Sequence, residues 1–138
     1  MAAVRGRLMT LKIGNGASPE VFTTVDHLRT TSMTINNEMV DISTKDTNGW
    51  RELGENMGIS TMSISVGGIQ YDSTVHGTLE SNCRGGAIDN YQITFDNGDE
   101  YEVAMQVTTF TRAGGYNDAE TFDMTIESAG IPTFTPGA

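Results

Sequence analysis

The sequence is poor in the residue types that covalently stabilise small proteins or anchor them in membranes. Its single cysteine, Cys83, excludes an internal disulfide framework. No apolar stretch is long enough to span a bilayer, and the N-terminal segment MAAVRGRLMTLKIGN lacks the apolar centre of a signal peptide. We therefore expect a chain that is made in a cytoplasm and has no membrane partner. Its 138 residues suffice for a single domain, 1–138, with a buried core.

Cations are also scarce. Lys and Arg number 8 against 18 Asp and Glu, so the formal net charge is −10. A protein that binds nucleic acid needs cations to replace the counterions of the phosphates, and an anionic membrane surface attracts cations too. The composition therefore argues against both partners. The acidity either keeps the protein soluble or forms a surface that must not adhere to DNA, and composition alone favours the first explanation.

No catalytic or metal-binding pattern emerges from the few reactive residues. His27 and His76 lie in different predicted elements without ligand spacing, and His76 is expected on the surface of a helix. Cys83 falls on an apolar stripe, which favours a small buried residue over a nucleophile. The acidic DNGDE segment lacks the distal Glu of a calcium loop and reads better as a solvated hairpin tip. We therefore predict no enzyme activity, no metal and no cofactor.

What the chain does contain is a series of short segments in which apolar and polar residues alternate, as is typical of strands. In the clearest of them, Met62, Ile64 and Val66 alternate with Ser and Thr. The dipeptide Asn36-Asn37 predicts a tight turn joining two strands in a hairpin, and Asn97-Gly98 predicts another. The predicted strands cover 8–13, 21–25, 30–35, 39–44, 59–66, 88–95, 101–111 and 121–128. A break is expected between the first two, in the segment GNGASP.

One segment, 72–84, predicts a helix. Val75, Leu79 and Cys83 recur at a spacing of four, a Ser or Asp precedes them as a cap, and Gly85-Gly86 ends the segment. The stripe is narrow, so the helix is expected to lie on a sheet. The sequence therefore predicts a mainly β protein: an antiparallel β-sandwich or open barrel with one flanking helix.

A polar, Gly-rich segment at about 44–58 interrupts the strands and carries the only Trp, Trp50. We expect a long arm between paired strands, with one helical turn in WRELGEN that ends at Gly54. Such an arm suits contact with another protein, although Trp50 could also fold back on its own domain. The C-terminal tail, about 129–138, retains Phe134, which is expected to dock on another subunit.

Three segments, in order, resemble the major tail tube proteins of long-tailed bacteriophages and of gene transfer agents. They read MVDISTKDTNGWREL, ISTMSISVGGI and FDMTIESAG, and together they lie between about 30 and 131. The resemblance implies a structural protein of which six copies form a ring. The inner strands of the ring would join into one barrel, and rings would stack into a conduit for DNA delivery. It further implies a place in the tail of a virion or phage-like particle that is assembled in the cytoplasm of a bacterial host.

The same resemblance implies partners and contact residues. Expected partners are other copies of the chain, tail terminator and tail-tip or baseplate proteins, and the tape measure protein during assembly. DNA would pass through without specific binding. The arm residues expected between subunits are Lys45, Asp46, Asn48, Trp50, Arg51 and Glu52. The lumen would be lined either by Thr61, Ser63 and Ser65 or by the face that carries Glu102 and Gln106, since alternation alone does not decide.

Two other interpretations stay open. Injection tubes of type VI secretion share the same fold and belong to the same class. A solitary β-sandwich that binds carbohydrate belongs to another class, and it would need a platform of aromatic side chains. Aromatic residues make up only 7% of the chain and do not cluster in the sequence, so the tube subunit is the preferred interpretation.

Overall fold

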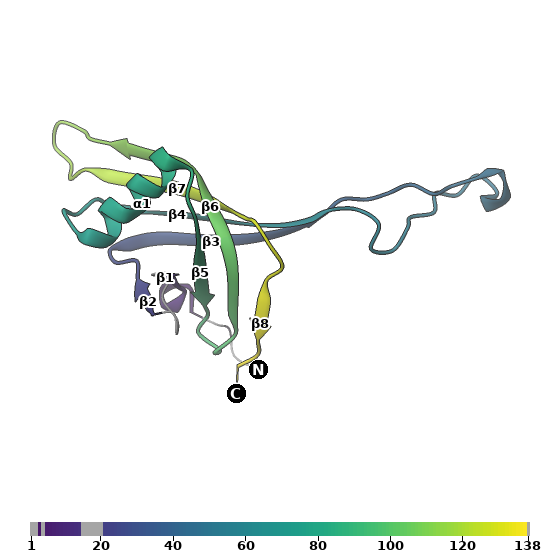
Figure 1. Ribbon diagram of the computed structural model, residues 1–138, viewed down its shortest axis with the longest axis horizontal. Helices are drawn as coiled ribbons and strands as arrows, with labels where there is room; N and C mark the ends of the chain where they lie inside the picture. Colours follow the sequence, from purple (N-terminus) through teal and green to yellow (C-terminus); the bar gives the residue numbers. More distant parts are fainter. Residues whose placement is uncertain (1–2, 4, 15–20, 138) are drawn as a thin grey trace.

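A single antiparallel sheet, curled on itself, forms the body of the molecule (Figure 1). The structure is a computed structural model that describes residues 3, 5–14 and 21–137, and within them the sheet has eight strands. Their order is β2-β1-β5-β6-β7-β4-β3, and β8 pairs with β6. The strands are β1 (Thr10–Gly14), β2 (Phe22–Thr24), β3 (Leu28–Asn37), β4 (Ser60–Ile69), β5 (Ile88–Thr94), β6 (Glu100–Ala113), β7 (Thr121–Ser128) and β8 (Thr133–Thr135). The predicted open barrel is thereby confirmed as a half-barrel. The GNGASP turn lies mostly outside the described residues.

The longest strand, β6, forms the corner of the curl. Its N-terminal half, up to Gln106, pairs with β5, and its C-terminal half, from Met105 onward, pairs with β7. A register shift between Val107 and Thr109 interrupts the ladder with β7. Such irregularities increase local twist and let a strand bend. The two parts of the sheet therefore turn toward each other and enclose the apolar face between them.

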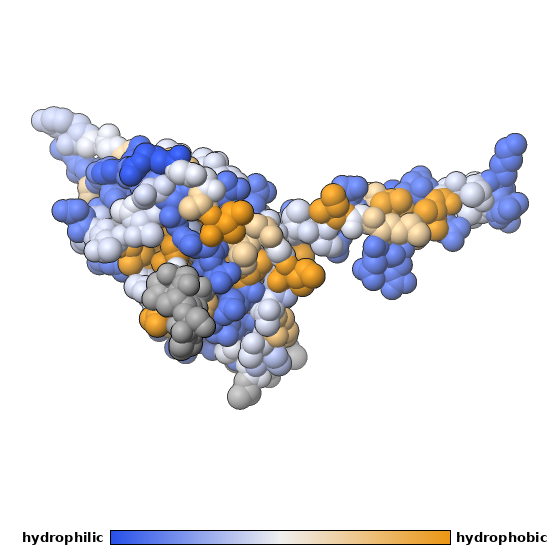
Figure 2. Space-filling model, viewed as in Figure 1, coloured by the Kyte–Doolittle hydropathy of each residue, from blue (hydrophilic) through white to orange (hydrophobic). Residues whose placement is uncertain are grey.

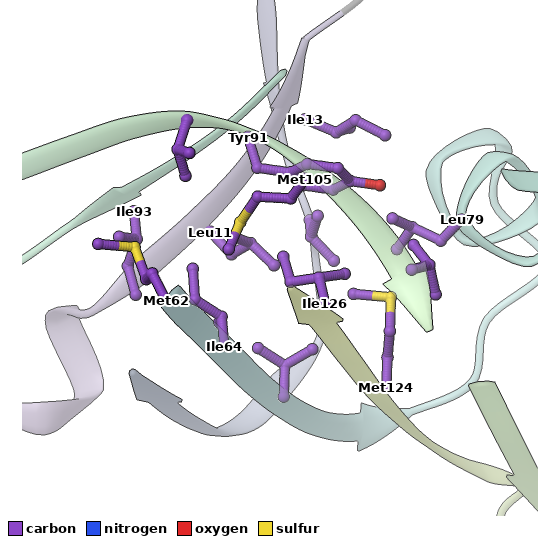
Figure 3. Packing of buried hydrophobic residues seen from close by; sticks show 14 of the residues in the cluster. Leu11, Ile13, Met62, Ile64, Leu79, Tyr91, Ile93, Met105, Met124 and Ile126 are labelled. Atoms are coloured by element: carbon purple, nitrogen blue, oxygen red, sulfur yellow. The ribbon is translucent and has the colours of Figure 1, made fainter. Parts of the chain in front are cut away.

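The core consists of alternate residues from the strands on both sides of the curl. Buried side chains come from β1, β4, β5, β6 and β7, and Figure 3 shows them converging between the strands. They are Leu11, Ile13, Val25, Met62, Ile64, Val66, Leu79, Tyr91, Ile93, Val103, Met105, Val107, Phe122, Met124 and Ile126. The alternation that predicted β4 and β7 is confirmed, because their odd and even residues face opposite sides of the sheet.

The predicted helix is α1 (Thr74–Gly85). Ser73 caps its start by accepting a hydrogen bond from the backbone of His76, and Gly86, with φ of 67°, ends it in the left-handed conformation. Leu79 is buried, and Val75 and Cys83 are half-buried against the core. In the described part of the chain no helix is long and apolar enough to cross a membrane.

The expectation that His76 is a surface residue is wrong. Its side chain is 1% exposed and packs on Phe122, with ring centroids 4.7 Å apart. The imidazole Nδ1 accepts the backbone N–H of Tyr71 at 3.1 Å, and Nε2 lies 2.9 Å from the backbone oxygen of Asp26. A buried imidazole requires such partners. His76 therefore ties the start of α1 to the connection before β3, a structural role that the helical spacing alone did not reveal.

The predicted hairpin at Asn36-Asn37 is also wrong. These residues continue β3, which pairs with β4 as far as Asn37 opposite Ser60. Residues 39–44 then run outward beside 52–54, where the N–H of Gly54 binds the oxygen of Val40 at 2.9 Å. A tight turn would satisfy only a few backbone groups, whereas the β3–β4 ladder pairs nine residues of each strand. The predicted helical turn in WRELGEN is absent as well, since a 3₁₀ turn, Lys45–Thr47, forms at the tip instead.

The C-terminal tail is not wholly free, because Thr133–Thr135 form β8 along the N-terminal half of β6. The ring of Phe134 packs on Tyr101, with centroids 4.9 Å apart, yet its side chain stays 48% exposed. Beyond it, the N–H of Gly137 binds a carboxylate oxygen of Asp99 at 2.9 Å. The aromatic of the tail therefore has one face on its own sheet and one face toward solvent.

The close approach of β4 to the turn before β3 provides a test of the fold. A Cβ on Gly68 would overlap the backbone oxygen of His27 and lie 2.9 Å from Cα of Leu28. Gly68→Ala is therefore expected to lower the free energy of unfolding by about 1–3 kcal/mol, because neither backbone atom can move aside. Gly77→Ala, in open space on α1, should instead raise it by about 0.5–1 kcal/mol. Urea denaturation measures both, and equal stabilities for the two variants would contradict this packing.

Candidate assembly surfaces

The arm is a two-chain extension of β3 and β4 that projects far from the body (Figure 1). It comprises residues 38–59, somewhat more than the predicted 44–58. The two chains are held by backbone hydrogen bonds, including one from Glu38 N–H to Ile59 oxygen and one from Ile42 N–H to Glu52 oxygen, both 2.9 Å long. Gly58 lies so close to the backbone of Glu38 that a Cβ would overlap it. The chains therefore stay paired along much of the arm without a core of their own.

Apolar side chains on this arm are left in solvent. Trp50 is 79% exposed, and the other exposed large apolar residues of the arm are Met39, Ile42, Leu53, Met57 and Ile59. Figure 2 shows hydrophobic residues along the middle of the arm. Contiguous apolar surface of this kind marks a site for another protein. The alternative in which Trp50 folds back on its own domain does not occur.

The polar residues predicted for contact sit near the same end of the arm. Lys45 and Asp46 belong to the 3₁₀ turn at the tip, which Thr44 caps, and Asn48 follows it with φ of 56°. Arg51 and Glu52 return toward the body beside Trp50. Nearer the body, the side chain and backbone of Ser43 donate hydrogen bonds that hold the pKa of Asp41 below its usual range. The arm therefore presents an indole among mixed charges.

The exposure of Trp50 leads to a prediction about the single subunit. Trp50→Ala should change the free energy of unfolding of the monomer by no more than about 0.5 kcal/mol, because an exposed side chain contributes little to the fold. If the arm is a contact between subunits, the same variant should assemble poorly, since buried aromatics dominate such contacts. Chemical denaturation and electron microscopy separate the two effects. A strongly destabilised monomer would show that Trp50 belongs to the fold.

Besides the outer edges of the short strands β2 and β8, two strand edges of the sheet are open among the described residues. Among the described residues, β3 pairs only with β4. Along a strand, the backbone N–H and C=O groups of successive residues point alternately toward and away from the neighbouring strand. Because the N–H of Glu38 bonds to the oxygen of Ile59, the even-numbered residues of β3 bond to β4. The backbone groups of the odd-numbered residues therefore point away from β4; these residues are Thr31, Met33, Ile35 and Asn37. On the other side, β5 covers one edge of β6 only as far as Gln106, and beyond it no strand of the described chain pairs with that edge, whereas β7 pairs with the opposite edge. Unpaired edges of this length normally need a partner.

The face of the sheet opposite the core is rich in hydroxyl groups. The register places Ser63 of β4 beside Thr34 of β3 and Glu127 of β7, and Glu127 lies beside Gln106 of β6. The candidate lumen residues Thr61, Ser63, Ser65, Glu102 and Gln106 therefore share one face, so the two alternatives left open by the sequence are the same surface. Asp123 and Thr125 of β7 lie on it too. Where β3, β4 and β7 pair, the register places no Lys or Arg on this face, but Arg29, at the register shift of β3, lines a pocket with Thr30 and Asp123 at its end.

The described residues do not form a metal site, since no group of three or more His, Cys, Asp or Glu side chains within them could hold an ion. The histidine pair illustrates this. His27 stacks on Tyr71 with centroids 3.5 Å apart, and His76 is buried in backbone contacts. Sequence reasoning missed the β3 and β6 edges, which depend on strand order and carry no local signal.

The arrangement matches a known family. The family model described as phage tail tube protein matches residues 3–134, so the chain belongs to the phage tail tube proteins. It is a tail tube protein, and this function is favoured over a carbohydrate-binding module. A comparison with curated proteins finds no match.

Solved structures agree with this assignment. The chain is 27% identical to a subunit from the tail of an empty gene transfer agent particle, solved by helical refinement with C6 symmetry, at a TM-score of 0.85; 96% of this chain and 99% of that one are covered. A subunit from the virion of a native gene transfer agent particle gives 27% identity and a TM-score of 0.83 over the same shares. The SPP1 tail tube protein has the same fold at 11% identity and a TM-score of 0.77, covering 97% of this chain and 80% of that one.

Proposed function

We propose that six copies of this chain close into a ring and that the rings stack into a hollow tail tube through which DNA is delivered. The observation that carries the proposal is the pair of open edges on one four-stranded part of the sheet, β6-β7-β4-β3. The C6 symmetry of the similar gene transfer agent tail supports six as the number of copies. The subunit would then act as a building block and not as a catalyst.

Ring closure follows from strand direction. Neighbouring strands in β6-β7-β4-β3 are antiparallel throughout, so β3 runs opposite to β6. If β3 of one subunit pairs with the C-terminal half of β6 in the next, that contact is antiparallel as well. Every subunit then uses both edges, and a ring of subunits becomes one closed barrel without any edge. The same contact would also prevent uncontrolled pairing of the exposed strand edges with other chains.

The arm would connect successive rings. It extends in the direction of β3 and β4, away from the body, and its apolar side chains have no partner within the subunit (Figure 1). Contact with a subunit of the neighbouring ring would bury them. We assign the contact to Lys45, Asp46, Asn48, Trp50, Arg51 and Glu52. The outer face of Phe134 is a second contact between subunits.

The hydroxyl-rich face would line the lumen. A barrel that is closed through β3 and β6 has two faces. The hydrophobic core, α1 and the rest of the sheet cover one of these faces. The other carries Thr61, Ser63, Ser65 and Gln106 with the acids of β7. Duplex DNA carries about one negative charge per 1.7 Å of its length, so a wall made mostly of hydroxyl groups and carboxylates would bind it only weakly. Lumen chemistry of this kind favours passage over binding.

In a particle, such a tube would need partners at both ends and during assembly. We infer a tail terminator, tail-tip or baseplate proteins and a tape measure protein, with assembly in the cytoplasm of a bacterial host and a final place in the tail. The single domain would span 1–138.

Electron microscopy of the purified protein tests the proposal. At high protein concentration, negative stain should reveal rings or tubes with a central channel and six-fold end views. Because tube subunits can wait for a nucleating complex, the same test is repeated with tail-tip proteins co-expressed from neighbouring genes. A protein that stays monomeric under both conditions would contradict the proposal.

A further inference from the structure

The open edge of β6 presents the backbone groups of its even-numbered residues. In line with the β4–β7 register, the N–H of Gln70 bonds to the oxygen of Glu120 at 2.8 Å. The even-numbered residues of β7 therefore bond to β4, and its odd-numbered residues bond to β6. Because Thr111 of β6 lies opposite one of these odd-numbered residues, the backbone groups of its neighbours Phe110 and Arg112 point to the open edge.

The side chains at the two open edges fall on the same face of the sheet. Ile35, on the edge of β3, lies opposite the buried Met62 of β4 and so shares the core face. Phe110, on the edge of β6, lies opposite the buried Met124 of β7 and shares that face as well. The edges of β3 and β6 therefore match in direction, in hydrogen-bond phase and in side-chain face, as an antiparallel pair requires.

Each edge also carries an apolar side chain that its own subunit covers only in part. Ile35 is 50% exposed. Phe110 stacks on Phe122 with ring centroids 5.8 Å apart and is half-buried against the core. A pair formed by an aromatic and a β-branched side chain on neighbouring strands stabilises a sheet. Ile35 and Phe110 are therefore suited to cover each other across a subunit contact.

We propose that β3 of one subunit pairs with β6 of a second copy in a single register, in which Ile35 lies opposite Phe110 and packs on its ring. The inference rests on the proposed function and names the residues that join neighbours within a ring. Met33 then lies opposite Arg112, and Thr31 meets the end of β6 just beyond it. The contact adds an apolar pair beside the core of each subunit.

The start of β5 limits how far the neighbouring β3 can extend along β6. Ile88 of β5 lies opposite Gln106 on this same edge. Nε2 of Gln106 donates a hydrogen bond to the oxygen of Gly86 at 3.1 Å, which holds the connection between α1 and β5 there. The place beside Gln106 is therefore already filled.

This limit selects the register. Asn37 is the last residue of β3 and must come after the filled place, so the nearest even-numbered residue that it can face is Thr108. Counting back along the antiparallel pair from Asn37 and Thr108 places Ile35 opposite Phe110. The register proposed is thus the longest ladder that does not collide with β5.

A shift away from β5 is less favourable. A shift of two residues would place Ile35 opposite Arg112, whose guanidinium is bound by Glu80 and Glu120. Phe110 would lose its apolar partner, and the ladder would lose one hydrogen-bonded pair. A shift of one residue would set the side chains of the two edges on opposite faces of the sheet.

The competing partner for β3 is β3 of another copy, related by a two-fold axis. Such a dimer would also be antiparallel, but it would leave the edge of β6 open in both subunits and Phe110 without a partner. Pairing of β3 with β6 uses both edges of every subunit. The second copy is therefore expected to contribute β6.

Disulfide trapping tests the register. Asn36 and Thr109 would lie opposite each other as a pair without hydrogen bonds, with Cα atoms about 4.5 Å apart, which a disulfide can span. Within one subunit β7 and β4 lie between them, a separation of roughly 14 Å that no disulfide can span. The test variant carries Asn36→Cys and Thr109→Cys in the full chain with Cys83→Ser.

Two matched variants move one exchange by two residues. One combines Thr34→Cys with Thr109→Cys, and the other combines Asn36→Cys with Thr111→Cys. Each move shifts one sulfur by roughly 7 Å along its strand, which is out of reach in the proposed register. All variants, including each single exchange, are assembled under reducing conditions and viewed by electron microscopy. They are then oxidised and separated on a denaturing gel without reductant.

Tubes with the exchanges at Asn36 and Thr109 should place more than half of the protein in a covalent ladder that runs from dimers to the complete ring. The shifted variants and the single exchanges should run as monomers. A ladder from a shifted variant instead, or tubes without a ladder in any variant, would overturn the register and leave the tube function intact. Dimers from Asn36→Cys alone would indicate the two-fold pairing and overturn it too. A lack of tubes in the chain without exchanges would overturn the tube function and this inference together.

Discussion

Subunits with Thr31→Pro are expected to fold normally and to form no rings at all. The N–H of Thr31 points away from β4, toward the open edge of β3, so proline removes no hydrogen bond from the monomer. In the closed barrel the same N–H would pair with β6 of the next subunit. Proline deletes that bond and places its ring where the neighbouring strand must lie. One such defect would recur at every subunit contact of the ring.

Circular dichroism and denaturation would report on the fold, and electron microscopy on rings and tubes. Thr31→Val is the matched control, because it retains the N–H and a β-branched side chain and should assemble like the original protein. Rings formed by the proline variant would show that β3 does not close the barrel. A proline variant that cannot fold would show that the edge of β3 is not free in the monomer.

The second large effect is expected from charge in the proposed lumen. Ser65→Lys combined with Asp123→Lys places two lysines per subunit on the hydroxyl-rich face, and this pair would recur in every ring of the tube. DNA moving through the tube would meet phosphate-binding cations along its whole path, and each contact releases counterions and favours retention. We expect tubes of normal appearance and a large loss of DNA delivery by the particles. The loss should lessen as the salt concentration rises, because salt weakens phosphate contacts.

The control must add equal charge elsewhere. Asp72→Lys combined with Ser81→Lys makes the same two kinds of exchange at exposed positions just before and on α1, away from the hydroxyl-rich face. These particles should deliver DNA normally. Delivery that is unchanged by the Ser65 and Asp123 exchanges, or equally reduced by the control, would argue that this face does not line the conduit.

Much of the secondary structure could be read from local patterns. Alternation in 59–66 and 121–128 predicted β4 and β7 because one face of each strand packs on the core and the other does not. The Ser cap, the spacing of Leu79 and the terminal glycines predicted α1. The errors share a cause. Asn36-Asn37 is compatible with a turn, but the long ladder with β4 outweighed that local preference. The burial of His76 depends on the backbone of Tyr71 and Asp26, outside the helix.

The candidate contact residues could also be predicted in part from local sequence patterns. A lone Trp in a polar, Gly-rich segment predicted a contact residue; the structure leaves its side chain exposed, and the contact itself stays a prediction. The hydroxyl residues of β4 and the face of Glu102 and Gln106 were two separate candidates for the lumen. Alternation shows which residues of one strand share a face, but not which side of the sheet that face lies on. Register across β4, β7 and β6 was needed to place them together.

By itself, the sequence determined which residues are apolar on one side of each strand and where the helix begins and ends. These are short-range properties, set by side-chain chemistry and backbone preference. Only the tertiary structure decided that β3 and the end of β6 remain as open edges and that the arm stands clear of the body. Such features depend on pairing between segments far apart in the chain, where hydrogen-bond ladders and core packing, summed over many residues, exceed any local preference.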